Sequence, residues 1–352
     1  MNPVTNVTST PCHHVGIWNA DSICYSFKDE LPTLYDIYET QNFSSDIAAS
    51  SSYWLSSYVT DFNNEHYVII SHSLASGNGV IYRASTLSLG PSNAYASYVS
   101  SANLSANAVT DFNITTHGYG FAALSDDKLS KIRSWSDHDG VVFDITFGAT
   151  SPVIFNGGAG QFLWMKIPAN EWAMPACRTT GSITVNGKEV KIDPNRSFTW
   201  YDRQWNYNHD LGRLSGGAST GGSTGNWTWF QIHLDYTPIK ASIWAIDIEN
   251  PHERDRFATI RSNDGSLQFL PVGFSADMTK TWVSEASGVE YPLKWNLDFA
   301  HGDFLSIESV TANQEMFGQS ASNTAYEGFV FVSGRMRNQR VTGFGIVEMT
   351  SM

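Results

Sequence analysis

The chain has no long uncharged apolar run. Among its 352 residues, no such run approaches the roughly 18–20 residues that cross a bilayer as a helix. The N-terminal segment Met1–Gly16 also lacks an apolar stretch that could form the core of a signal peptide. The sequence therefore excludes a membrane-spanning helix. Its N-terminus fits either a cytosolic protein or a chain from which a signal peptide has been removed.

Positive charge is scarce. Lysine and arginine number 21 against 34 aspartates and glutamates, which gives a formal net charge of −13. This excess repels phosphate backbones and argues against a nucleic-acid partner. Charged residues make up only 16% of the chain, whereas aromatics make up 13% and include 12 tryptophans. Because disordered chains are poor in apolar and aromatic residues, the composition predicts a globular protein with a large core.

Cysteine is equally scarce, with three in the chain. Cys12 and Cys24 could form one disulfide that ties down a polar N-terminal arm and leaves Cys177 over, or they could be two unpaired buried thiols. Six Asn-X-Ser/Thr sequons occur in polar stretches, although composition alone would give about as many. These glycosylation candidates are Asn6, Asn42, Asn103, Asn113, Asn195 and Asn226. Cysteines and sequons together favour the secretory pathway or an extracellular location slightly over the cytosol.

Helical periodicity is nearly absent. The best window, Asp126–Ser134, would make one or two turns. Elsewhere, segments of four to eight residues alternate apolar with polar side chains between Gly, Asn, Asp and Ser clusters, which is typical of β-strands. The clearest predicted strands are His66–Leu74, Gly140–Phe147, Trp227–Leu234, Ser242–Ile248 and Phe329–Ser333.

Two short hairpin signals support an antiparallel β fold. Asn186-Gly187 and Asp264-Gly265 each separate two strand-like segments, and such pairs suit the type I′ turn because both central residues need positive φ. Many short strands at close spacing predict sandwiches or barrels. For this length we expect an all-β chain of two packed modules, residues 1–178 and 179–352.

Metal and nucleotide motifs are missing. His13-His14 are adjacent and point to opposite faces of an extended chain, and His252-Glu253 lacks the downstream histidine of a helical zinc motif. A formal Gly-X-Ser-X-Gly match places Ser219 inside the low-complexity loop Ser215–Gly225, without the flanking strand and helix of a nucleophile elbow. We expect no metal and no cofactor.

The segment Trp200–Trp205 packs two indoles, a phenol, a carboxylate, a guanidinium and an amide into six residues. In an extended chain, Tyr201 and Arg203 share one face with Trp205, while Asp202 lies on the other. Adjacent Asp202 and Arg203 therefore need separate partners. The segment is either a buried polar network between sheets or part of a cavity wall.

The predicted strand Trp227–Leu234 has a mixed face. Trp229, Gln231 and His233 alternate with Phe230 and Ile232, so two polar groups lie beside an indole. Apolar walls with a few directed polar groups are typical of a ligand pocket. An exposed face whose polar groups are hydrogen-bonded is the alternative.

Several of these segments together resemble a known superfamily. Trp172–Gly187 followed by Thr199–Trp205 resembles the signature of the lipocalin-like AttH/CrtC superfamily. The resemblance extends from Trp164 to Glu348 and is weaker before that, where only Tyr53-Trp54 and the strands around it are similar. Further similar segments are Trp227–Phe230, Trp282–Trp295, Gln314-Glu315, Tyr326–Gly328, Ser333-Gly334 and Gly343–Glu348. The chain departs from the pattern at Asn206, where Gly is common, and at His233, where Gln is common.

The resemblance implies two lipocalin-like β modules with an apolar pocket at or near their interface. The fungal Diels–Alderases of the superfamily are the most similar branch, which implies a cofactor-independent [4+2] or hetero-Diels–Alder cycloaddition between an electron-poor diene, such as an o-quinone methide, and an alkene. Such an enzyme holds two π systems in a reactive geometry and polarises the diene carbonyl with a hydrogen-bond donor. The partner would be an apolar small molecule. The sequence leaves the oligomeric state open, a homodimer included.

The site residues of this hypothesis fall into three groups. The catalytic candidates are His233, Gln231 and Tyr201. The apolar walls are Trp54, Trp164, Trp229, Trp244, Trp282 and Trp295, and the structural network is Asp202, Arg203, Trp205 and Glu327. Two alternatives remain. One is a hydratase that adds water to an isoprenoid or prenyl alkene with Asp202 or Glu327 as the acid, its pKa raised by an apolar site. The other is a non-catalytic carrier of an apolar ligand.

Overall fold

The computed structural model describes eleven stretches of the chain. They are residues 34–42, 50–76, 79–103, 112–138, 140–149, 151–206, 225–249, 252–262, 265–318, 320 and 323–351. No helix within them is long and apolar enough to cross a membrane. Several sequence features lie outside the described residues: Cys12, Cys24, His13-His14, Asn6, Ser219 and Asp264.

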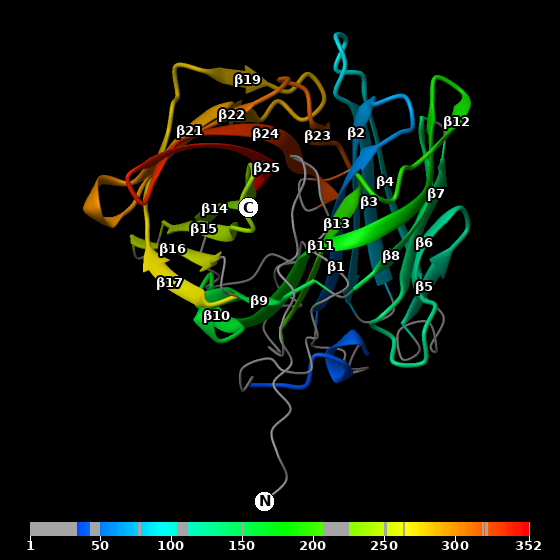
Figure 1. The fold of residues 1–352 in the computed structure, drawn as a ribbon, viewed down its shortest axis with the longest axis horizontal. Coiled ribbons are helices and arrows are strands. Elements are labelled where there is room, and N and C mark those ends of the chain that lie inside the picture. Colours follow the sequence, from blue (N-terminus) through cyan, green and yellow to red (C-terminus); the bar gives the residue numbers. More distant parts are fainter. Residues whose placement is uncertain are drawn as a thin grey trace, which may run out of the picture.

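The first sheet, called the N-terminal sheet, has the order β4-β3-β2-β1-β13-β11-β8-β7-β6-β5, with β9, β10 and β12 also paired to β11 (Figure 1). Its strands are β1 (Ser50–Thr60), β2 (His66–Ser76), β3 (Gly79–Ser88), β4 (Tyr95–Asn103), β5 (Asn113–Thr116), β6 (Tyr119–Ala123), β7 (Ile132–His138), β8 (Val141–Gly148), β9 (Ile154–Phe155), β10 (Gln161–Trp164), β11 (Ile167–Val185), β12 (Lys188–Lys191) and β13 (Phe198–Asn206). Two short 3-10 turns, η2 (Glu39–Gln41) and η3 (Asn156–Gly158), accompany it.

The second sheet, called the C-terminal sheet, has the order β17-β16-β15-β14-β25-β24-β22-β21-β18, with β23 paired to β24, and curls into the barrel-like unit on the left of Figure 1. Its strands are β14 (Gly225–Leu234), β15 (Lys240–Ile248), β16 (Glu253–Arg261), β17 (Leu267–Pro271), β18 (Gly273–Ala276), β21 (Lys294–Asp298), β22 (Phe304–Ser309), β23 (Glu315–Met316), β24 (Ala325–Met336) and β25 (Gln339–Ser351). The strands β19 (Thr281–Val283) and β20 (Glu290–Pro292) form a separate two-stranded sheet in the same part of the chain, which also holds the turn η5 (Ala300–Gly302).

The all-β prediction is confirmed, and the five clearest predicted strands lie in β2, β8, β14, β15 and β24. Asn186 and Gly187 adopt φ values of 50° and 75° and join β11 to β12, as a type I′ turn requires. The prediction of one or two helical turns at Asp126–Ser134 is wrong. There, the Asp127 carboxylate accepts the backbone N–H groups of Leu129 and Ser130, which fixes a turn before β7 begins at Ile132.

The division between the sheets differs from the expected boundary at residue 178. Arg178 lies inside β11, where it pairs with Gly148 of β8 and Phe198 of β13. The strands change from one sheet to the other between Asn206 and Gly225. The expected boundary lay just before the Asn186-Gly187 turn, but this turn closes a hairpin between the end of β11 and β12. β11 is long enough to pair with five other strands of the same sheet.

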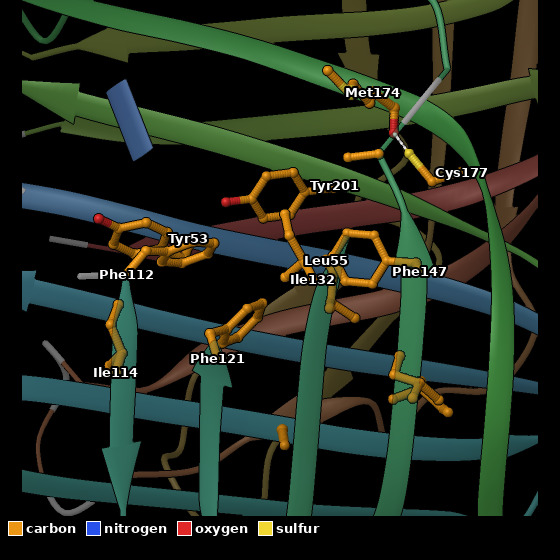
Figure 2. Close-up of a cluster of buried hydrophobic side chains, with 14 of the residues drawn as sticks. Tyr53, Leu55, Phe112, Ile114, Phe121, Ile132, Phe147, Met174, Cys177 and Tyr201 are labelled. Atoms are coloured by element: carbon orange, nitrogen blue, oxygen red, sulfur yellow. Dashed lines mark hydrogen bonds between the residues drawn. The ribbon is translucent and has the colours of Figure 1, made fainter. Parts of the chain in front are cut away.

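The described residues form three hydrophobic clusters. One lies within the N-terminal sheet, around Tyr53, Phe121 and Tyr201 (Figure 2). Another lies within the C-terminal sheet, around Phe230 and Trp295. The third, which we call the interface cluster, draws on both sheets, with Trp54, Tyr58 and Trp200 from the first and Trp229, Trp244 and Phe344 from the second. Alternation along β1, β13, β14 and β15 sends one face to the core of its own sheet and the other face to this shared layer.

Candidate functional site

A row of four side chains crosses the N-terminal sheet on its interface side. Asp202 of β13 is the cross-strand partner of Trp54 in β1. His72 of β2 follows next to Trp54, and Arg83 of β3 follows next to His72. Because directly paired residues point to the same face of a sheet, the four form one continuous row. All four are buried.

A second row crosses the C-terminal sheet opposite the first. Trp244 of β15 pairs with Trp229 of β14, and Trp229 pairs with Glu348 of β25. Glu348 in turn pairs with Glu327 of β24. Two indoles and two carboxyl groups thus face the first row, and all are buried.

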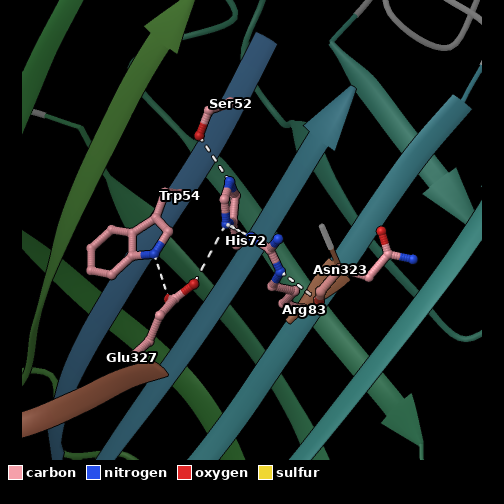
Figure 3. A network of polar contacts seen from close by, with 6 residues as sticks. All are labelled: Ser52, Trp54, His72, Arg83, Asn323 and Glu327. Atoms are coloured by element: carbon pink, nitrogen blue, oxygen red, sulfur yellow. Dashed lines mark hydrogen bonds and ion pairs between the residues drawn. The ribbon is translucent and has the colours of Figure 1, made fainter. Parts of the chain in front are cut away.

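The two rows touch at Trp54. Its indole N–H donates to Glu327 Oε2 at 2.7 Å (Figure 3). Its ring also meets that of Trp229 edge-on, at 5.1 Å between centroids. The interface therefore places a carboxyl group of the C-terminal sheet against an indole of the N-terminal sheet.

His72 is held as a neutral imidazole. Arg83 donates from Nη1 to His72 Nδ1 at 3.3 Å, so His72 Nε2 carries the proton and donates to Ser52 Oγ at 2.9 Å (Figure 3). Burial lowers the pKa of His72, in keeping with this form. Glu327 Oε1 lies 3.6 Å from His72 Nδ1, too far for a hydrogen bond, and has no hydrogen-bond partner among the described residues.

His72, Glu327 and Glu348 also offer one ligand atom each within 4.8 Å of one another. Such spacing could hold a metal ion. However, the Arg83 guanidinium donates to His72 Nδ1, the histidine atom nearest Glu327, and so places a fixed positive charge beside the group. The donor set fits an acid–base cluster better than a cation site.

Two further carboxyl groups lie in the same layer. Burial raises the pKa of Asp202 to about 7, and burial together with the Asp202 charge raises the pKa of Glu171 well above its usual range. Asn156 donates to Glu171 Oε1 at 2.6 Å, and the Trp200 indole donates to Asp202 Oδ2 at 3.3 Å. Two adjacent buried carboxyls cannot both ionise readily, so the pair retains a proton near neutral pH.

Glu348, in the second row, also has a raised pKa. Burial, with the neighbouring Glu327 charge next in size, raises its pKa well above the usual range. Among the described residues, four buried carboxyl groups therefore lie in this layer, and we call them the carboxyl cluster: Glu171, Asp202, Glu327 and Glu348.

The predicted catalytic residues separate in the structure. Gln231 and His233 lie on the interface side of β14, on the face shared with Trp229, as the alternation predicted. Tyr201 lies on the opposite face of β13, in the core of the N-terminal sheet, where its hydroxyl donates to Gln41 Oε1 at 3.0 Å. Tyr201 is thus not brought to the interface.

The predicted wall tryptophans also separate. Those in or against the interface cluster are Trp54, Trp164, Trp229 and Trp244. Trp295 is fully buried in the core of the C-terminal sheet, and Trp282 packs against that core beside Tyr291. Neither reaches the interface, because their strands turn those positions inward.

The predicted structural network divides between the two faces of β13. Arg203 is buried against the Tyr53 ring and donates to the backbone oxygens of Thr40, Ser52 and Gln204. Trp205 lies 5.3 Å from the Arg203 guanidinium on the same side. Asp202 and Glu327, in contrast, belong to the carboxyl cluster. Arg203 and Trp205 therefore lock η2 onto the sheet.

The described sequon asparagines are all exposed: Asn42, Asn103, Asn113, Asn195 and Asn226. Cys177 is buried, with its Sγ 3.6 Å from the Met174 carbonyl oxygen. His252 is exposed, and the neighbouring Glu253 pairs with Lys166.

Sequence reasoning missed four residues of the site: His72, Arg83, Glu171 and Glu348. Each is an ionisable residue among the apolar, small and hydroxyl-bearing residues of a strand, which is the signal that could have marked it. Their common location depends on the pairing of β1, β2, β3, β11 and β25, which the alternation pattern does not give.

Comparisons with known proteins identify relatives along nearly the whole chain. The AttH-like family model matches residues 93–352. A kievitone hydratase from Fusarium solani subsp. phaseoli is 39% identical over 334 residues, which cover 95% of this chain and 88% of the relative. The dehydratase asqC of Emericella nidulans is 33% identical over 334 residues, covering 92% and 91%. The crystal structure of kievitone hydratase from Nectria haematococca matches with a TM-score of 0.83 and 36% identity, covering 97% of this chain and 98% of that one.

The cycloaddition hypothesis is wrong. Relatives that span more than nine-tenths of this chain are named for adding or removing water. The site agrees with them, because a cycloaddition requires no proton donor, whereas the interface buries carboxyl groups with raised pKa. The chain is an enzyme, and the hydratase alternative fits these findings better than the cyclase.

Proposed function

Because the chain belongs to the AttH-like family, we propose that it adds water to, or removes water from, an apolar isoprenoid or prenylated small molecule at the interface of its two sheets. The observation that carries the proposal is the carboxyl cluster beside the Trp54 and Trp229 indoles. The names of the relatives support the reaction class.

Hydration of an unactivated alkene begins with a proton donor. An acid that stays protonated at neutral pH must have a raised pKa, and an apolar, buried carboxyl provides it. Asp202, with a pKa of about 7, shares this property with Glu171 beside it. In the proposal, the Asp202 carboxyl gives its proton to the less substituted alkene carbon, and the π electrons form the new C–H bond.

The resulting carbocation needs an environment that stabilises positive charge without reacting. Trp54 and Trp229 supply indole faces beside the cluster. A desolvated cation over such a face gains about 2 kcal/mol. The carboxylate charge nearby adds electrostatic stabilisation in a layer from which water is largely excluded.

Water then attacks the cation, and its oxygen forms the new C–O bond. Glu327 is placed to take the released proton, because Trp54 occupies its Oε2 while its Oε1 has no hydrogen-bond partner in the described part of the chain. In sum, one alkene and one water molecule become one alcohol, and one proton moves from Asp202 to Glu327. The reverse sequence is dehydration.

The test uses kievitone, the compound for which the relative is named, together with a panel of prenylated phenols and the matching tertiary alcohols. In ¹⁸O-labelled water, hydration yields a product that is heavier by one water molecule and carries the label. Mass spectrometry detects this product. Asp202→Asn and Glu327→Gln should each reduce the rate roughly 10²–10⁴-fold.

A matched control is Glu315→Gln. Glu315 is also buried, but its carboxylate accepts hydrogen bonds from Ser284, Ser287 and Tyr291 of the C-terminal unit and from no member of the cluster among the described contacts. Its amide variant should keep the rate in molecules that remain folded. Wild-type turnover by both Asp202→Asn and Glu327→Gln would contradict the proposed chemistry.

A further inference from the structure

Two carboxyl groups of the cluster, Glu171 and Asp202, lie side by side on the interface face of the N-terminal sheet. Asp202 of β13 is the cross-strand partner of Ala173 in β11, and Glu171 lies two residues before Ala173. Residues two apart along a strand share a face, so Glu171 and Asp202 are diagonal neighbours. The pair retains one proton near neutral pH, and Asp202 can act as an acid only when it carries that proton.

The charges around the pair favour the proton on Glu171. The titratable groups nearest to it are Tyr35 of the segment 34–42, neutral because burial raises its pKa, Arg203 of β13, Glu348 of β25 and, beyond it, Glu327 of β24. Burial raises the pKa of both carboxyl groups. The charges of Asp202 and then Glu348 raise that of Glu171 further, whereas hydrogen bonding and the Arg203 charge lower that of Asp202. These charges by themselves would leave Asp202 ionised.

A side-chain amide acts in the opposite direction. Asn156 donates from Nδ2 to Glu171 Oε1 at 2.6 Å, and both side chains are buried. A donor at this distance stabilises the ionised carboxylate of Glu171 relative to its protonated form. The hydrogen bond that Asp202 accepts from the Trp200 indole is longer, at 3.3 Å. The amide therefore favours an ionised Glu171 beside a protonated Asp202.

The turn that carries Asn156 is held by both sheets. In η3, Gly157 has a φ of 69° and a ψ of 11°, a left-handed conformation that favours glycine. Its N–H donates to Thr259 Oγ1 of β16, in the C-terminal sheet, at 3.1 Å. On the other side, the Asn156 carbonyl oxygen accepts the Gly160 N–H, and the Gly160 carbonyl oxygen accepts the Glu171 N–H, both at 2.9 Å. The amide of Asn156 is thus fixed relative to the backbone of Glu171.

We propose that Asn156 is a positioning residue that keeps the proton shared by Glu171 and Asp202 on Asp202. The inference rests on the proposed hydration and deepens it, because it names the residue that sets the protonation state of the acid. Asn156 acts through Glu171, whose carboxylate it stabilises, and touches neither the alkene nor Asp202 in this role. Its removal should move the shared proton to Glu171.

The test locates the proton by infrared spectroscopy, without turnover. Protein made with aspartate that carries ¹³C in its side-chain carboxyl is compared with unlabelled protein at pH 6, below the Asp202 pKa of about 7. The C=O stretching band of a protonated carboxyl moves to lower frequency on labelling only if it belongs to an aspartate. Wild type should show such a band, and Asp202→Asn should lack it, which assigns the band to Asp202.

Asn156→Leu removes the amide and keeps a side chain of similar size. This variant should lose most of the aspartate band and gain a protonated glutamate band that labelling does not move. With the best alkene substrate, its kcat should fall roughly tenfold at an almost unchanged KM, and the decline of the rate with pH should begin at a lower pH.

The matched control is Asn170→Leu. Asn170 precedes Glu171 in β11, so it points to the opposite face of the strand, where it accepts a hydrogen bond from Gln161 at 3.1 Å. The same substitution there should leave the aspartate band and the rate as in wild type. If Asn156→Leu does not fold, Asn156→Ala removes the amide without adding an apolar group and is measured in its place.

The labelled band separates this inference from the hydration itself. A wild-type protein without an aspartate band at pH 6 would overturn the inference, because the proton would then lie on Glu171. A folded variant without the Asn156 amide that keeps the full aspartate band would overturn it as well. Failure to hydrate any alkene would instead overturn the proposed function, while the band would still report which carboxyl group holds the proton.

Discussion

Trp54 and Glu327 lie 273 positions apart in the chain, yet the indole N–H of one donates to the carboxylate of the other at 2.7 Å. This hydrogen bond joins β1 of the N-terminal sheet to β24 of the C-terminal sheet. It fixes one oxygen of Glu327 and leaves the other directed toward His72. Its consequences for stability can be measured directly.

Trp54→Phe should destabilise the fold by about 1–3 kcal/mol, because a buried carboxylate oxygen loses its donor. Urea unfolding at pH 7 measures the change in the free energy of unfolding. Trp282→Phe is the control, since that indole is only partly buried and packs against the core of the C-terminal sheet. Equal losses in the two variants would show that the hydrogen bond to Glu327 contributes little.

Asp202 should make the protein less stable as the pH rises from about 4 to 7. Its folded pKa of about 7 exceeds the usual value of 3.8, so the folded state binds the proton more tightly than the unfolded state. This contribution is fully present below the unfolded pKa and is lost on the order of 1.4 kcal/mol per pH unit up to the folded pKa. Urea unfolding at pH 4, 5.5 and 7 should therefore show a shallower decline for Asp202→Asn than for wild type. Parallel declines would mean that Asp202 is already ionised in the fold.

The rate of hydration should fall above about pH 7. The proposed proton donor Asp202 ionises there, and an ionised carboxyl cannot protonate an alkene. A profile of kcat against pH checks this, with kievitone or the best substrate of the panel. A rate that rises through pH 7 to 9 would be incompatible with a carboxylic acid in this role.

Arg203→Ala should cost about 2–5 kcal/mol and loosen η2. The guanidinium donates to the backbone oxygens of Thr40, Ser52 and Gln204, and its removal leaves them buried without those donors. Unfolding experiments and limited proteolysis near residue 40 measure the effect. Arg133→Ala is the control, because Arg133 pairs with Asp144 at the surface and should cost at most about 1 kcal/mol. Similar costs for both variants would contradict the locking role.

Chelation should leave the rate unchanged. Although His72, Glu327 and Glu348 have metal-like spacing, Arg83 donates to His72 Nδ1 and disfavours a second positive charge there. Dialysis against EDTA followed by the ¹⁸O assay tests this expectation. Activity that disappears on chelation and returns with one divalent ion would identify the three residues as ligands.

Strand alternation predicted much of the local arrangement. The pattern of β14 correctly placed Trp229, Gln231 and His233 on one face, and the adjacency of Asp202 and Arg203 correctly sent them to different partners. Both results follow from the two-residue period of a strand, which is a property of the local chain. The site residues inferred from the family resemblance also included Tyr201 and Trp295, which lie in the cores of the two sheets. Periodicity could not exclude them, because it assigns a residue to a face without saying which core that face meets.

The sequence by itself determined an acidic, aromatic-rich, all-β chain, its main strands and its type I′ turn at Asn186-Gly187. Only the tertiary structure decided which faces meet. Asp202 helps to raise the pKa of Glu171 because β11 and β13 are neighbours, and Glu327 joins them because β24 packs across the interface. A pKa shift depends on burial and on the distance between charges, and both quantities are set by contacts between strands that are remote in the chain.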